Sequence, residues 1–278
     1  MIFVVGLQQI AAQTSVDAGT YQKDLEWSSD SPAGFAELTI PSAGRSLQGF
    51  MYKANGSKPH PTLILLHGYP GNERNLDLAQ AVRAHGWNVI YFNYRGSWGS
   101  QGEFSFRNCV DDVKNVYAYL KQNAAQFQVD PARVALFGHS MGGFVCLKAL
   151  QEMPEINKGF ALSAWDIYAD TSGAVKANKL AALEKDADSI FVLHKKSGKA
   201  LFADVVRDPN FHNLLKTAEP LAAKQVVMLD EHNNNRSLAA AIQHANRSYF
   251  DYQVWNTDHS FTNKRISLIN TVIAFLDR

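Results

Sequence analysis

The hydrophobic positions of the chain form short runs that alternate with longer amphipathic stretches. The runs predicted to be strands lie at residues 62–66, 88–92, 134–137, 159–163, 225–229 and 252–255. The first is continuously apolar, as expected of a strand buried on both faces. Stretches predicted to be helices lie at about residues 75–85, 106–126, 143–150, 237–247 and 264–277. This alternation predicts a largely parallel sheet with helices on both faces.

Two further strands are expected before this alternating part. Residues 37–40 alternate between polar and apolar like a half-buried strand, and residues 47–52 are apolar and aromatic enough to be its antiparallel partner. Residues 41–44 (PSAG) have the composition of a turn between them. The alternation in the second strand is imperfect, which makes Gly49 a candidate β-bulge. We therefore expect one domain at residues 35–278, preceded by a lead-in at residues 1–34.

The alternation of strands and helices stops at about residues 166–220. This stretch is helix-prone and rich in alanine, lysine and aspartate. A segment of this length between two strands of one sheet is more than a connection. We interpret it as a helical cap inserted over the C-terminal edge of the sheet, where the active sites of open α/β sheets lie.

The composition narrows the possible partners. The formal net charge is +1, from 27 basic and 26 acidic residues, so there is no electrostatic case for binding nucleic acid or an anionic membrane. No apolar run approaches the ~20 residues of a membrane span. Cys109 and Cys146 fall in predicted helices, where buried apolar thiols are expected rather than disulfides or a zinc site. We expect no metal and no cofactor.

The first residues of the chain allow two interpretations. Residues 1–7 are apolar, but the run is short and lacks a basic start. Residues 16–18 (VDA) resemble a small-residue cleavage site. The segment is therefore either a tail of a cytoplasmic protein, which is the default expectation, or part of an export signal, which would place the protein in the periplasm or outside the cell.

The most informative motif is at residues 138–142 (GHSMG), which match the pattern G-x-S-x-G. It directly follows the predicted strand at 134–137 and precedes the predicted helix at 143–150. A strand, a sharp turn and a helix are the context in which this pattern forms a nucleophile elbow, with the serine exposed above the sheet. A phosphate-binding loop is the competing interpretation, but no Gly-Lys-Ser/Thr follows. The motif indicates Ser140 as a nucleophile.

A serine hydroxyl needs a neighbouring base, usually a histidine held by a carboxylate, and in this arrangement the chain order is Ser, acid, His. His259 follows the last predicted strand and is the best candidate for the base. The acid is expected after the strand ending at residue 229. Asp230 is the first choice, and Glu231 and Asp166 are alternatives.

The oxyanion of an acyl-transfer intermediate needs two backbone N–H donors. One is expected from Met141, the residue after the nucleophile. The other is expected from Tyr69, in the loop at residues 67–71 (HGYPG) that follows the first buried strand. Pro70 has no N–H to donate.

Together, the motifs at residues 67–71, 94–102 (YRGSWGSQG), 138–143 and 258–259 resemble those of the α/β-hydrolase superfamily. The chain looks most like its prolyl-oligopeptidase-like and serine-aminopeptidase-like branch, over about residues 35–278. The resemblance implies an α/β-hydrolase fold with Ser140, His259 and an acid near Asp230 as catalytic residues, and Tyr69 and Met141 as the oxyanion hole. The family usually shows Gly-x-x-Asp after the penultimate core strand, whereas residues 230–234 here read DEHNN.

The expected function is hydrolysis of a carboxylic ester, a thioester or a small peptide or amide bond through an acyl-enzyme on Ser140. The substrate would be a small molecule or a short peptide. Two alternatives remain at the level of sequence. The departure from the usual acid motif is compatible with a non-catalytic binding protein of the same fold, and an acyltransferase would use the same triad.

Overall fold

The computed structural model describes residue 25 and residues 27–278. The lead-in expected at residues 1–34 therefore falls mostly outside the described residues, including the apolar start and the cleavage-like site. Residues 27–33 contain no helix or strand, and the first strand begins at Gly34.

The centre of the molecule is an eight-stranded sheet with the order β1-β2-β4-β3-β5-β6-β7-β8. Its strands are β1 (Gly34–Ser42), β2 (Arg45–Lys53), β3 (His60–Leu66), β4 (Asn88–Phe92), β5 (Val129–His139), β6 (Lys158–Leu162), β7 (Gln225–Asp230) and β8 (Tyr249–Val254). The pairings of β1 with β2 and of β2 with β4 are antiparallel, and all others are parallel. The carboxyl ends of the parallel strands therefore meet at one edge of the sheet.

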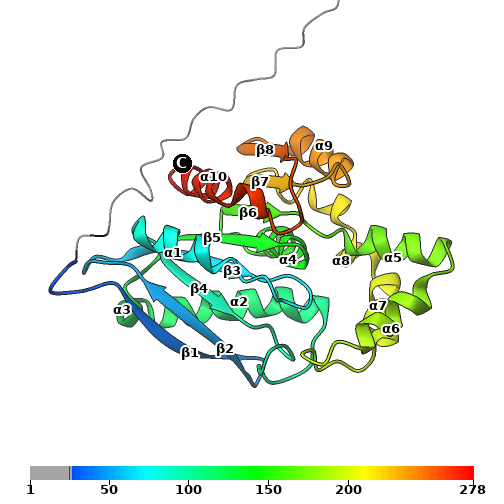
Figure 1. Ribbon diagram of the computed structural model, residues 1–278, viewed down its shortest axis with the longest axis horizontal. Coiled ribbons are helices and arrows are strands. Elements are labelled where there is room, and N and C mark those ends of the chain that lie inside the picture. The colour runs from blue at the N-terminus through cyan, green and yellow to red at the C-terminus, as the bar shows by residue number, and fades with distance from the viewer. Residues whose placement is uncertain (1–24, 26) are drawn as a thin grey trace, which may run out of the picture.

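Helices cover both faces of this sheet (Figure 1). One face packs against α2 (Phe106–Gln122), α4 (Met141–Glu152) and α9 (Arg236–Ala245). The other packs against α1 (Leu76–Ala84) and α10 (Arg265–Leu276). A short helix, α3 (Ala124–Phe127), precedes β5. The expectation of a mostly parallel sheet with helices on both faces is confirmed.

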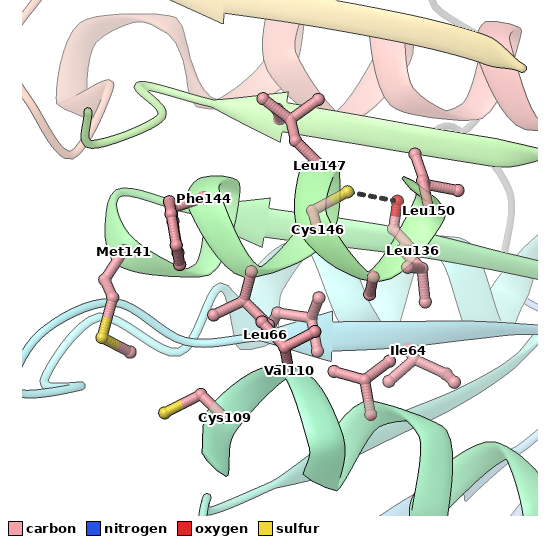
Figure 2. Packing of buried hydrophobic residues seen from close by; sticks show 14 of the residues in the cluster. Ile64, Leu66, Cys109, Val110, Leu136, Met141, Phe144, Cys146, Leu147 and Leu150 are labelled. Carbon is pink, nitrogen blue, oxygen red and sulfur yellow. Dashed lines mark hydrogen bonds between the residues drawn. The ribbon is translucent and has the colours of Figure 1, made fainter. Parts of the chain in front are cut away.

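The larger core lies between the sheet and helices α2 and α4 (Figure 2). Side chains of β3 and β5, such as Ile64 and Leu136, meet those of the two helices there. Cys109 on α2 and Cys146 on α4 are both free and fully buried, and burial raises the pKa of both thiols. The expectation of buried apolar thiols is confirmed.

Gly49 does not form the β-bulge that its position suggested. The β1–β2 register runs without interruption from the pair Gly34–Lys53 to the pair Ser42–Arg45. A Cβ on Gly49 would instead lie 2.6 Å from the carbonyl oxygen of Tyr91 on β4. Close approach of a neighbouring backbone, rather than an extra residue, explains the glycine.

The chain between β6 and β7 forms the helices α5 (Ile167–Lys176), α6 (Leu180–Asp188), α7 (Gly198–Arg207) and α8 (Pro209–His212) and a 3₁₀ helix at Leu214–Thr217. These helices lie beside the sheet edge (Figure 1). The connection between α6 and α7 is fastened to the loop after β4 by a bridge between Leu193 and Ser97, and by backbone hydrogen bonds of His194 with Gly96 and Phe104. This part of the chain is therefore attached to the main body within its length as well as at its two ends.

A buried ion pair holds the loop after β4. Arg95 Nε lies 2.5 Å from Asp112 Oδ1 on α2, and the Arg95 N–H donates to the other carboxylate oxygen at 2.8 Å. Ser42 Oγ donates to the same carboxylate at 2.6 Å, which ties in the end of β1. The Asp112 side chain is fully buried. The loop is thus held by one carboxylate that joins three elements.

We expect Asp112→Ala to lower the free energy of unfolding by about 3–5 kcal/mol, because it leaves the Arg95 guanidinium buried without its partner. Chemical denaturation of the variant and the wild type measures the difference. Asp111→Ala is the matched control, since Asp111 makes only a partly exposed pair with Lys114 and its loss is expected to cost at most about 1 kcal/mol. Equal effects of the two substitutions would contradict the role assigned to the buried pair.

Candidate active site

Ser140 lies at a sharp turn between β5 and α4. Its backbone angles are φ 59° and ψ −119°, a region that residues other than glycine rarely adopt. The turn is tight enough to exclude side chains beside it: a Cβ on Gly138 would lie 1.9 Å from the carbonyl oxygen of Gly142, and one on Gly142 would lie 1.9 Å from that of Leu66. Ser140 itself is only half-buried. The sequence motif thus presents a strained, accessible serine at the end of a central strand.

The loop after β3 lies directly against this serine. A Cβ on Gly68 would lie 3.2 Å from Ser140 Cβ and 3.7 Å from Ser140 Oγ, so only a glycine leaves space there. Among the described residues, neither the Tyr69 N–H nor the Met141 N–H has a hydrogen-bond acceptor. Both of the expected oxyanion donors are therefore unoccupied and belong to segments that meet at Ser140.

His67 controls the orientation of this loop. Its Nδ1–H donates to the Gly68 carbonyl at 2.8 Å, and burial lowers the pKa of the imidazole to about 4, so the ring is neutral near pH 7. The carbonyl of Gly68 and the N–H of Tyr69 belong to one planar trans peptide and point in opposite directions. The hydrogen bond from His67 therefore also fixes the direction of the Tyr69 N–H.

His259 follows β8, and its imidazole is a little over half exposed. Its ring lies 4.8 Å, between centroids, from the ring of His139, the residue before Ser140. The His259 carbonyl also accepts a 2.8 Å hydrogen bond from His139 Nε2. Burial lowers the pKa of His139 to about 4, so this neighbour is neutral and can donate from Nε2. His259 is thus held beside the nucleophile turn.

The carboxylate that contacts His259 is that of Glu231. His259 Nδ1 lies 2.6 Å from Glu231 Oε1, and Ser163 Oγ donates a hydrogen bond to Glu231 Oε2. Burial by itself would raise the pKa of Glu231, but the hydrogen bonds from His259 and Ser163 outweigh it and lower this pKa to about 2. The hydrogen bond to Glu231 raises the pKa of His259, against the opposing effect of burial. Glu231 is therefore an ionised partner of the imidazole.

Asp230, the first choice from sequence, does not contact His259. It is the last residue of β7, and its fully buried carboxyl accepts hydrogen bonds from Asn235 Nδ2 at 3.2 Å and Tyr252 OH at 3.0 Å. Burial raises its pKa to about 6. Because successive side chains of a strand point to opposite faces, Asp230 turns into the interior and Glu231 turns toward the imidazole. We therefore replace Asp230 by Glu231 as the candidate acid.

Asp166, the third candidate acid, has a local role. It is the N-cap residue of α5, and its Oδ1 accepts a 3.0 Å hydrogen bond from the Ala169 N–H. Such caps satisfy one of the free N–H groups at a helix start. Its hydrogen bonds are directed to the helix and not to His259.

The site residues follow four neighbouring strands of the sheet. Ser140 follows β5, Ser163 follows β6, Glu231 follows β7 and His259 comes after β8, and these strands lie side by side (Figure 1). No hydrogen bond joins Ser140 Oγ to His259 within the described part of the chain. The structure thus brings the candidate acid and the candidate base together and places the candidate base beside the turn that carries Ser140.

Aromatic side chains stand beside Tyr69. Its ring lies 5.8 Å from that of Trp165 and 5.9 Å from that of Phe104, both measured between centroids. The ring of Phe106 contacts Phe202 of α7 and so continues the cluster into the helices between β6 and β7.

The sequence analysis did not identify Trp165 or Ser163 as candidate site residues. The available signal was their place just after a parallel strand, where α/β proteins gather functional residues.

Within the described residues, no group of three or more histidine, cysteine, aspartate or glutamate side chains is arranged to hold a metal ion. The same part of the chain contains no helix with the length and hydrophobicity needed to cross a membrane.

The chain is similar to several known proteins. The sequence model of the family described as serine aminopeptidase, S33, matches residues 57–232, more than half of the chain. A Mycobacterium tuberculosis protein is 30% identical over 124 residues, which are 44% of this chain and 43% of that protein. The lysophosphatidylserine lipase ABHD12 of Danio rerio is 27% identical over 105 residues, which are 37% of this chain and 26% of the lipase. The matches span less than half the length of these relatives.

Among solved structures, an esterase of Pyrococcus furiosus has a TM-score of 0.65 and 21% sequence identity. The match covers 92% of this chain and 95% of the esterase. At this level of identity the likeness shows that the two proteins share a fold over almost their whole lengths.

Proposed function

The chain belongs to the serine aminopeptidase S33 family of α/β hydrolases, and from this premise we propose that it cleaves a carboxylic ester, a thioester or a small amide bond through an acyl-enzyme on Ser140. The observation that carries the proposal is the 2.6 Å hydrogen bond between Glu231 and His259, at the sheet edge where the strained Ser140 stands. A histidine oriented by an ionised carboxylate beside an accessible serine is the arrangement that activates a hydroxyl nucleophile.

Catalysis begins with proton transfer. His259 Nδ1–H donates to Glu231, which leaves Nε2 as the basic nitrogen. Nε2 takes the proton of Ser140 as its oxygen attacks the substrate carbonyl, and the Glu231 carboxylate stabilises the imidazolium that forms. The imidazolium then gives its proton to the leaving group. Water attacks the acyl-enzyme with the same base and regenerates Ser140. The hydrogen bond between a catalytic serine and its histidine often forms only when substrate binds.

The negative charge on the carbonyl oxygen is stabilised by the N–H groups of Tyr69 and Met141. They have no other acceptor in the described structure, and the hydrogen bond from His67 to Gly68 holds the first of them in place. Donors that are already oriented cost no reorganisation when the charge develops. The role of His67 is thus to keep the oxyanion hole formed in the absence of substrate.

Labelling with a fluorophosphonate probe tests the proposal. A single adduct, mapped to Ser140 by mass spectrometry of the digested protein, is the expected result, since the reagent requires an activated serine. Hydrolysis of p-nitrophenyl esters of increasing chain length then samples the ester class, to which the names of the zebrafish lipase and the P. furiosus esterase point. A folded protein that takes up no label would contradict the proposal and favour the non-catalytic alternative.

The pH dependence of kcat/KM follows from His259. The base must be neutral, and its pKa lies above the ordinary 6.5 because of the hydrogen bond to Glu231. Activity is therefore lost as the pH falls through a midpoint above 6.5. His67 and His139, with pKa values of about 4, do not contribute in this range. A kcat/KM profile from about pH 5 to about pH 9 measures the midpoint for the free enzyme, and a midpoint well below 6.5 would be inconsistent with His259 as the base.

A further inference from the structure

We propose that Ser163 is a positioning residue for the catalytic acid. Its hydroxyl holds the second oxygen of the Glu231 carboxylate and thereby keeps the first oxygen on His259. This inference rests on the proposed function, because it assigns a role within the same triad.

The two oxygens of Glu231 have separate partners. Oε1 accepts from His259 at 2.6 Å, and His232 Nε2 lies 3.6 Å from the same atom. Oε2 accepts from Ser163 Oγ, its one hydrogen-bond partner in the described structure. A glutamate side chain has several rotatable bonds, so one hydrogen bond alone does not fix its carboxylate plane. With both oxygens bound, rotation away from the imidazole breaks two contacts.

Ser163 is well placed to act as a fixed support. It is the first residue after β6, and its N–H donates to the Leu229 carbonyl on β7 at 2.8 Å. It is therefore anchored to the strand that leads into Glu231, two residues before that glutamate. Only 3% of Ser163 is exposed, whereas His259 is exposed. One oxygen of the Glu231 carboxylate is thus bound to the buried Ser163, and the other is bound to the exposed His259.

The backbone at Ser163 does not favour serine. Its φ is 46°, in the left-handed region that glycine adopts without strain and other residues adopt at a cost. A role limited to the turn would be met better by glycine. The feature that serine adds is its hydroxyl, and the partner of that hydroxyl is Glu231. The geometry therefore connects the choice of residue to the acid rather than to the turn.

The test compares Ser163→Ala and Ser163→Gly, alone and combined with Glu231→Gln. Both single variants lack the hydroxyl, but only glycine relaxes the backbone, so glycine keeps the test possible if the alanine variant is unstable. The readouts are kcat and KM for p-nitrophenyl butyrate, and the rate of Ser140 phosphonylation by a fluorophosphonate. We expect both variants to lower kcat and the phosphonylation rate by about 10-fold with KM within about twofold, as for other residues that orient a catalytic group.

The combination with Glu231→Gln separates a positioning role from a general structural one. If Ser163 acts through the acid, removing its hydroxyl changes the phosphonylation rate by less than about twofold once Glu231 is glutamine. In proton NMR spectra, the downfield signal of the His259 Nδ1–H should weaken or shift in both Ser163 variants that keep Glu231.

Three outcomes overturn the inference: unchanged kcat in both Ser163 variants, a loss in the alanine variant that glycine restores, or an undiminished loss in the Glu231→Gln background. If the fluorophosphonate labels Ser140 of the wild-type protein, each of these outcomes refutes the role of Ser163 and leaves the proposed function intact. If the wild-type protein is folded but Ser140 is not labelled, the proposed function is refuted, and the role of Ser163 is refuted with it.

Discussion

Glu231→Gln is expected to lower kcat by about 10⁴-fold, the effect typical of a triad acid replaced by its amide. Glutamine has nearly the shape of glutamate but carries no charge, so it cannot stabilise the imidazolium of His259. Its amide nitrogen can also face Nδ1 and favour the tautomer whose Nε2 carries the proton and cannot act as a base. The substitution should leave the fold unchanged.

Asp230→Asn is the matched control, since it makes the same chemical change at the adjacent residue. Asp230 accepts a hydrogen bond from Asn235 on Oδ1 and one from Tyr252 on Oδ2. In asparagine the amide oxygen can still accept from Asn235, and the NH2 group can donate to the Tyr252 hydroxyl, which can act as donor or acceptor. We expect kcat to change by less than about 10-fold, because Asp230 does not contact the base. Steady-state kinetics on the best p-nitrophenyl ester decide between the two residues. A large loss in Asp230→Asn with little effect of Glu231→Gln would return the acid to Asp230.

Ser140→Ala is expected to lower kcat by about 10⁶-fold, because it removes the hydroxyl that forms the proposed acyl-enzyme. Any residual rate would come from substrate binding and the oxyanion donors. Alanine keeps a Cβ at the strained position, so the thermal stability should remain close to that of the wild type. Fluorophosphonate labelling should disappear in parallel with turnover.

Ser260→Ala provides the control for Ser140→Ala. Ser260 directly follows His259 and is also half-buried, but it is its backbone carbonyl, rather than its hydroxyl, that accepts a hydrogen bond from Arg265. We expect full labelling and activity within about twofold of the wild type, as for most substitutions away from key contacts. Full turnover by the Ser140→Ala variant would exclude the acyl-enzyme route.

The sheet could be predicted because its strands carry their signal locally. Apolar runs at residues 62–66 and 88–92 match β3 and β4 to within two residues, and the motif at 138–142 places the sharp turn between β5 and α4. The prediction of the last strand was less accurate, because β8 begins at Tyr249, three residues before the predicted start at 252. Its residues are all partly exposed or exposed, so their pattern is weak at this edge of the sheet.

The choice of acid could not be predicted because it depends on a single residue position. The strand expected to end at residue 229 continues through Asp230, which pairs with Val254 of β8. This extension places the Asp230 side chain in the interior and the next one at the site. The role of Ser163 depends on contacts between residues 68 positions apart, which no local pattern encodes. Helices between β6 and β7 were expected from the sequence. The bridge from the connection between α6 and α7 to Ser97 was not, because it also joins distant residues.

The positive φ angles of Ser140 and Ser163 have a consequence for the evolution of the protein. Each costs roughly 1–3 kcal/mol that a glycine would avoid. Selection for folding alone would therefore move both positions toward glycine, and a lineage that lost its chemistry would become more stable as it did so. Under the proposed function, serine is kept at both turns for its hydroxyl, and we expect a relative with glycine at either position to be more stable and less active.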